Sequence, residues 1–117
     1  MTANARPGEI LYLVGFTPDD GFEDLLNEWY EKEHIPELMS CPGFLSVRRY
    51  ILEGGDIESP RYVAEWRLSG MEAFDSEEYR SLQRRGPDEL SELARESSLH
   101  RTRSLWAQYR EIPRGNG

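Results

Sequence analysis

Residues 44–68 read FLSVRRYILEGGDIESPRYVAEWRL, and this stretch decides the fold. Its two ends, 44–52 and 61–68, alternate apolar or aromatic side chains with polar ones, which is the period-2 pattern of strands. The middle contains Gly54 and Pro60, residue types that favour a turn. The stretch therefore predicts an antiparallel hairpin in the middle of the chain.

A strand and a helix precede this hairpin. Residues 10–16, ILYLVGF, predict a short buried strand. Apolar side chains at helical spacing then predict a helix over 20–35. Pro36 should end or kink that helix, because a proline has no N–H for the bond to the preceding turn. The first half of the chain is therefore β-α-β.

A helical region and a strand follow the hairpin. The spacing of apolar residues predicts helix over 71–98, interrupted at Gly86, with Pro87 as the first residue of a second helical piece. Residues 99–112 predict the last strand. The second half of the chain therefore repeats the order β-α-β.

Two such units predict an α+β fold of ferredoxin-like βαββαβ topology, with an antiparallel sheet in strand order 4-1-3-2. Helices can cover only one face of this sheet. The other face carries Tyr, Trp and Val among its Arg, and in water it would expose a large apolar patch. We therefore expect a closed two-fold homodimer that pairs these faces and encloses a ligand cavity between them.

Composition excludes several classes of protein. A length of 117 residues predicts one domain over 1–117, with loose tails at 1–8 and 113–117. A net charge of −8 disfavours nucleic-acid binding, because phosphate backbones repel an acidic protein. There is no apolar leader and no run of membrane-spanning length, and the single cysteine, Cys41, is typical of a reducing compartment. We expect a cytoplasmic protein without a membrane partner.

The charges are distributed unevenly. Acidic residues gather in the predicted helices, and arginines gather in the predicted strands. One interpretation is that both sets form solvated surfaces. The other is a positively biased sheet face, which would suit an anionic or carbonyl-rich ligand.

Residues 29–38, WYEKEHIPEL, followed by Cys41-Pro42-Gly43-Phe44 and then Arg48-Arg49-Tyr50, resemble the dimeric α/β-barrel superfamily, and most of all its EthD-like branch. There, a Trp, a His five residues on, a Pro shortly after, and a Pro-Gly that opens the second strand recur. The resemblance implies a dimeric α/β barrel. Members of the superfamily include ring-closing and dehydrating polyketide enzymes, muconolactone isomerases, cofactor-free quinone-forming monooxygenases and haem-binding proteins.

His34 is the predicted catalytic residue, a general acid/base at the rim of the cavity. A neutral imidazole accepts a proton from a C–H acid or returns one to an enolate. The end of the predicted helix should raise the pKa of His34, because the helix dipole favours a cation there. The alternative is a structural histidine that bonds the backbone carbonyls freed by Pro36.

Four further residues are predicted to bind the substrate: Tyr12, Arg48, Tyr50 and Glu65. Alternation places Arg48 and Tyr50 on one side of their strand. Facing the dimer cavity together with Glu65, they could hold a carboxylate or an enolate oxygen. The alternatives are a structural Arg–Glu pair across strands and, for Tyr12, an ordinary core aromatic.

No metal site and no cofactor are predicted, because two distant histidines and one cysteine have no ligand spacing and no phosphate-binding loop is present. Haem ligation by His34 or His100 stays open. Two functions follow. One is a cofactor-independent enzyme (isomerase, dehydratase, cyclase or monooxygenase) acting on a small, oxygen-rich, cyclic or aromatic metabolite. The other is a non-catalytic homodimer that binds a small ligand or serves as an accessory protein.

Overall fold

Residues 6 and 8–115, which the computed structural model describes, form one four-stranded antiparallel sheet in the order β2-β3-β1-β4. The strands are β1 (Ile10–Pro18), β2 (Phe44–Ile51), β3 (Tyr62–Leu68) and β4 (Ser98–Ala107). This confirms the predicted ferredoxin-like α+β fold and its strand order, 4-1-3-2. The predicted loose tails lie partly outside the described residues, which omit 1–5, 7, 116 and 117.

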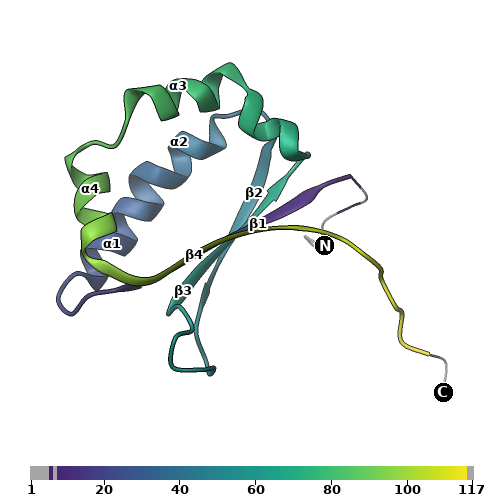
Figure 1. The fold of residues 1–117 in the computed structure, drawn as a ribbon, viewed down its shortest axis with the longest axis horizontal. Helices are drawn as coiled ribbons and strands as arrows, with labels where there is room; N and C mark the ends of the chain where they lie inside the picture. Colours follow the sequence, from purple (N-terminus) through teal and green to yellow (C-terminus); the bar gives the residue numbers. More distant parts are fainter. Residues whose placement is uncertain (1–5, 7, 116–117) are drawn as a thin grey trace.

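The helices of the described chain cover a single face of the sheet (Figure 1). The first crossover contains α1 (Glu23–Trp29), the π-helical turn η1 (Tyr30–His34) and α2 (Ile35–Met39). The second contains the 3-10 turn η2 (Met71–Asp75), α3 (Glu77–Arg85) and α4 (Glu89–Glu96). None of these helices is long and apolar enough to cross a membrane, within the part of the chain that the structure describes.

Pro36 was predicted to end or kink the first helix, and the predicted end is wrong. The helical backbone continues to Met39, and a π turn precedes the proline: the Ile35 N–H bonds to the Tyr30 carbonyl, five residues back. A proline ring inside an ordinary α-helix clashes with the carbonyl four residues before it. The wider π turn relieves that clash and keeps the proline within the helix.

The predicted interruption at Gly86 and Pro87 is confirmed, but the helix after it starts later than expected. Asp88 caps α4, with its carboxylate accepting a 2.8 Å hydrogen bond from the Ser91 N–H, and Glu89 is the first helical residue. An aspartate is a strong N-cap. Pro87 therefore precedes the cap instead of opening the helix.

The last strand is shorter than predicted, ending at Ala107 and not at residue 112. Ala107 pairs with Ile10, the first residue of β1, so beyond Ala107 the chain meets no further strand among the described residues. It projects from the sheet as an extended tail (Figure 1). The side chains of Trp106, Tyr109 and Ile112 are 56%, 89% and 79% exposed.

The strand register decides which side chains lie under the helices. Partners in an antiparallel pair point to the same face. Trp66 pairs with Tyr12 on one side and with Val47 on the other, and Trp66 is fully buried beneath the helices. Phe44 packs in the same layer, 5.6 Å edge-to-face from Trp66. These residues form the centre of the hydrophobic core.

The opposite face of the sheet, which we call the open face, has no helix over it within the described chain (Figure 1). Its rows follow from the register, for example Arg48 beside Glu65 beside Leu13. The open face carries these side chains: Leu11, Leu13, Arg48, Tyr50, Val63, Glu65, Arg67, Ser104 and Trp106.

Gly43, before β2, provides a test of the packing. It adopts a φ of +91°, and a Cβ there would lie 2.7 Å from Ala73 Cβ and 2.9 Å from Ser69 Oγ. Gly43→Ala should lower the free energy of unfolding by about 1–2 kcal/mol for the left-handed backbone, with about 1–3 kcal/mol more for overpacking. Urea unfolding measures the effect. Gly54→Ala, where a Cβ meets nothing within 4 Å, is the matched control and should stay within about 0.5 kcal/mol of the parent.

Candidate functional site

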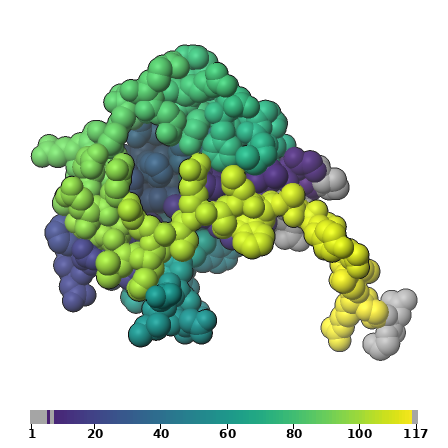
Figure 2. All heavy atoms as spheres, in the orientation of Figure 1, coloured from purple at the N-terminus to yellow at the C-terminus, as the bar shows by residue number. Residues whose placement is uncertain are grey.

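A pocket of about 260 Å³ lies on the helix side of the sheet, between β1, β4, the first helix and α4. We call it the His34 pocket. Figure 2 shows the hollow on this side of the molecule, with the blue first helix visible behind the green and yellow chain. Apolar walls come from β1, α1 and α4. The polar side chains that line it are His34, Ser91, Arg95, Ser98 and Arg101.

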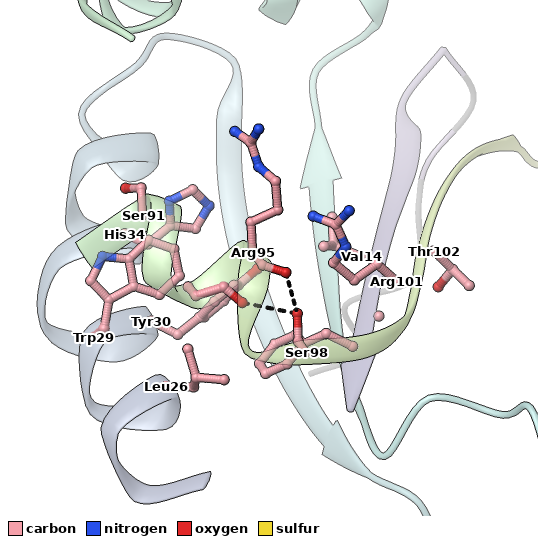
Figure 3. A pocket seen from close by; sticks show the side chains of 13 residues that line it. Val14, Leu26, Trp29, Tyr30, His34, Ser91, Arg95, Ser98, Arg101 and Thr102 are labelled. Carbon is pink, nitrogen blue, oxygen red and sulfur yellow. Dashed lines mark hydrogen bonds between the residues drawn. The ribbon is translucent and has the colours of Figure 1, made fainter. Parts of the chain in front are cut away.

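His34 and Trp29 form one wall of this pocket, with their rings side by side (Figure 3). The two rings stack with centroids 4.9 Å apart and planes at 21°, and the ring of Tyr30 lies 5.0 Å from that of His34. The stacking follows from the π turn, because its five-residue repeat brings residues 29 and 34 onto one side of the helix. The turn that accommodates Pro36 therefore also orients His34.

The imidazole of His34 is half-buried and forms no hydrogen bond with any described residue, whereas His100 Nδ1 lies 3.2 Å from Thr17 Oγ1. Burial lowers the pKa of His34 below its ordinary value, and nearby Glu37 only partly opposes the shift. The prediction of a raised pKa is therefore wrong. The helix continues past His34, so the imidazole lies inside it and not at its negative end. His34 is accordingly neutral at pH 7 and able to accept a proton.

His34 also lines a second cavity of about 250 Å³, on the side of α2, α3 and α4. This cavity shares Ser91 and Arg95 with the first one and is more polar. At its edge, the Arg85 guanidinium donates to the Glu37 carboxylate. His34 thus lies between a more apolar pocket and a more polar one.

Tyr30 forms the deep wall beside His34. It is 3% exposed, and burial raises the pKa of its phenol. The phenol oxygen of Tyr30 and the indole nitrogen of Trp66 have no hydrogen-bond partner among the described residues. The Arg49 guanidinium lies 4.8 Å above the Tyr30 ring. A buried cation therefore lies directly behind the pocket wall.

The predicted site residues fall on two sides of the sheet. Arg48, Tyr50 and Glu65 do come together: Arg48 pairs with Glu65 across strands, and Arg48 Nη1 lies 3.4 Å from Tyr50 Oη. They belong to the open face, however, and His34 lies on the opposite side. The structure therefore does not bring them into one cavity with His34, and their role in binding stays a prediction for the open face.

Tyr12 lies on the helix side but outside the His34 pocket. Its ring meets Phe74 edge-to-face at 5.4 Å, and the Arg103 guanidinium lies 5.2 Å above it. It is 9% exposed. These contacts are those of a core aromatic, the alternative that its sequence position left open.

Sequence reasoning missed most of the lining of the His34 pocket, notably Trp29, Tyr30, Arg95, Arg101 and Thr102. Trp29 carried a signal, since it stands five residues before His34 in the quoted motif. Arg95 and Arg101 carried none, because α4 and β4 meet the first helix only in the folded chain. Figure 3 shows their side chains across the cavity from Trp29 and His34.

No family model matches the chain, and no curated protein sequence matches it either. Solved structures do match. SnoaB, a cofactor-independent oxygenase from Streptomyces nogalater, is 17% identical over 92% of this chain and 99% of its own, with a TM-score of 0.66. A dimeric ferredoxin-like protein from an uncultured marine organism is 16% identical over 92% of this chain and 100% of its own, with a TM-score of 0.65.

A monooxygenase from the gene ActVA-Orf6 of Streptomyces coelicolor, solved in complex with nanaomycin D, is also similar. It is 13% identical over 93% of this chain and 94% of its own, with a TM-score of 0.59. At such identities the likeness is one of fold. The chain thus has the ferredoxin-like fold that its sequence predicted.

Proposed function

We propose that the protein is a cofactor-independent oxygenase of monooxygenase type, with His34 as the general base and the His34 pocket as the substrate site. The observation that carries the proposal is a neutral, half-buried histidine that faces an apolar pocket and has no hydrogen-bond partner within 8–115 or at residue 6. A histidine that is not engaged in the fold has its nitrogens available to a ligand. Fold neighbours that are named oxygenases support the same class of reaction.

The pocket suits a small aromatic molecule that carries an acidic oxygen. Trp29, Tyr30 and Phe16 offer ring faces and edges for stacking. Arg95 and Arg101 stand across the cavity, and neither forms an ion pair within the part of the chain that the structure describes. A guanidinium without a carboxylate partner is suited to hold a phenolate or enolate oxygen. This is the oxygen-rich class of substrate that the sequence predicted.

The chemistry begins when His34 removes a proton from a CH₂ group activated by an adjacent carbonyl or phenol. The resulting carbanion transfers an electron to O₂, and the two radicals combine into a C–O–O bond. The resulting peroxide anion takes back the proton held by His34. His34 then removes the remaining C–H proton, which cleaves the O–O bond and leaves a C=O group and a hydroxide. The hydroxide takes that second proton from His34 and leaves as water. One oxygen atom thus enters the product, the other leaves as water, and the substrate carbon is the reductant.

The test uses the purified protein and a panel of hydroxylated anthrone-like and naphthol-like compounds. We expect O₂ uptake equal to substrate consumed, and one labelled atom in the product under ¹⁸O₂. Conversion that proceeds equally without O₂ would instead indicate an isomerase or cyclase. A ligand that raises the melting temperature in air without being converted would indicate the non-catalytic alternative.

We further propose that the open face is covered by a second copy of the chain. Leu11, Leu13 and Val63 form an apolar strip along its centre, and Trp106 extends the strip at one edge. A two-fold axis would superpose these side chains on their copies and remove the strip from water. Fold neighbours described as dimeric support the same arrangement.

Light scattering at micromolar concentration should therefore give twice the chain mass of 13.6 kDa. Leu13→Glu puts a charge at the centre of the open face and should give a folded monomer, because a desolvated like-charged pair would form across the axis. Leu25→Glu, at a 41% exposed position on α1, is the matched control and should stay dimeric. A parent protein that scatters as a monomer would contradict the proposal.

A further inference from the structure

Arg49 is a largely buried arginine behind the proposed site. It projects from β2 toward the helices, in the row of Ala64 and Val14, and only 15% of its side chain is exposed. Arg48, its neighbour in sequence, lies on the open face. Transfer of a guanidinium out of water costs several kcal/mol before any partner is counted. An apolar side chain at this position would avoid that cost, so the contacts of Arg49 call for a specific explanation.

The two terminal nitrogens of Arg49 hold the first helix at two places. Nη2 donates to Asn27 Oδ1 at 2.8 Å, and Nη1 donates to Glu31 Oε2 at 2.9 Å. Asn27 lies in α1 and Glu31 in η1, so the two bonds span the junction where the α-helix becomes the π turn. A rigid planar fork is well suited to fix two acceptors relative to each other.

The flat face of the same guanidinium supports the ring beside the catalytic histidine. Arg49 Cζ lies 4.8 Å from the centroid of Tyr30, and the Tyr30 ring lies 5.0 Å from that of His34. Arg49 also lies 5.3 Å from the ring of Tyr62, so it fills the space between the sheet and the turn. Its Nε has no partner among the described residues. Arg49 therefore bonds the first helix through its two terminal nitrogens, while its Nε is left without a hydrogen bond.

We infer that Arg49 is a positioning residue: it clamps the junction of α1 and η1 and so holds the π turn that stacks His34 on Trp29 inside the pocket. The link to turnover rests on the proposed function of His34. The effect on the turn itself does not, because the hydrogen bonds and the stacking are properties of the fold. The test therefore measures both the state of His34 and the rate.

The variant is Arg49→Met, and the first readout is the pKa of His34, followed by NMR of the imidazole. The groups that face His34 from the other elements are Glu37, Arg85 and Arg95, and the substitution leaves them in place. We expect the pKa to rise toward 6.5, because burial holds it low and a loosened turn admits water to the imidazole. Turnover should fall about 10- to 100-fold, since small misplacements of a catalytic group have effects of that size.

Two controls separate positioning from stability. Arg61→Met removes another arginine that holds the first helix, through Glu23 at 2.9 Å, but at the far end from the π turn. It should lower the melting temperature without moving the pKa of His34. Asn27→Ala removes one of the two bonds of the clamp without changing any charge, so it should raise the pKa of His34 through loosening alone. It also gives a result if Arg49→Met does not fold.

The inference is overturned if the Arg49→Met and Asn27→Ala proteins have the same His34 pKa and the same turnover as the Arg61→Met control. It is supported if both raise that pKa while Arg61→Met does not. Failure of the proposed function shows separately: His34→Ala would then turn over substrate as fast as the parent, whereas the NMR titration would still decide the role of Arg49.

Discussion

His34→Ala is expected to lower turnover about 10²–10⁴-fold while the fold and the dimer persist, the range for loss of a general base. The imidazole makes no hydrogen bond within the described chain, so its removal breaks no polar contact of the fold. It does remove the group that accepts the substrate proton. Steady-state kinetics on a substrate found in the panel measure the loss, and circular dichroism and light scattering check the fold and the dimer.

His100→Asn is the matched control for this substitution. His100 is exposed, lies outside the His34 pocket and has a φ of +50°, a conformation that asparagine tolerates. It should retain the parent rate. Imidazole added to the His34→Ala protein should restore part of the lost rate, because the vacated space adjoins the pocket. A His34→Ala protein as fast as His100→Asn would remove His34 as the base.

The rate constant kcat/KM is also expected to fall at acidic pH. A general base must be neutral, and burial puts the pKa of His34 below 6.5. The rate constant kcat/KM should therefore be level above that pKa and fall about tenfold for each pH unit below it, a loss of about 100-fold two units down. Glu37 favours the protonated form of His34, and Glu37, Arg85 and Arg95 all line the second cavity beside it.

The free energy of unfolding should also fall as the pH is lowered. The folded pKa of His34 lies below the unfolded value, so the unfolded chain binds more protons. The contribution of His34 to stability is therefore lost as pH falls below about 6.5.

The residual activity of His34→Ala should not show the fall in kcat/KM at acidic pH. A parent rate that increases as the pH falls would show that His34 acts as a protonated acid instead.

The fold was predictable because its determinants are local. Alternation in 44–52 and 61–68 fixed the central hairpin, and the glycine and proline at 86 and 87 divided the second helical region, as the structure confirms. The predicted end of the helix at Pro36 was wrong because the steric clash of the proline ring can be relieved within a helix. The π turn that relieves the clash depends on the packing of the whole helix, and no single residue type predicts it.

The faces of the sheet could not be read from alternation alone. Alternation puts Phe44 on the side of Arg48 and Tyr50, yet Phe44 is buried under the helices while they lie on the open face. The cause is the register shift between Phe44 and Ser46, which leaves Leu45 as an extra residue. One bulge thus reverses the alternation at the start of the strand.

The sequence by itself determined the order of the strands, the central hairpin and the choice of His34 as the residue to test. Only the tertiary structure decided that His34 lies on the helix side, apart from Arg48, Tyr50 and Glu65, and that Arg49 lies behind it. The physical reason is that periodicity is a local property that reports which side chains share a face. A pocket is made where separate elements meet, here the first helix, α4 and β4, and their meeting depends on packing across the whole chain.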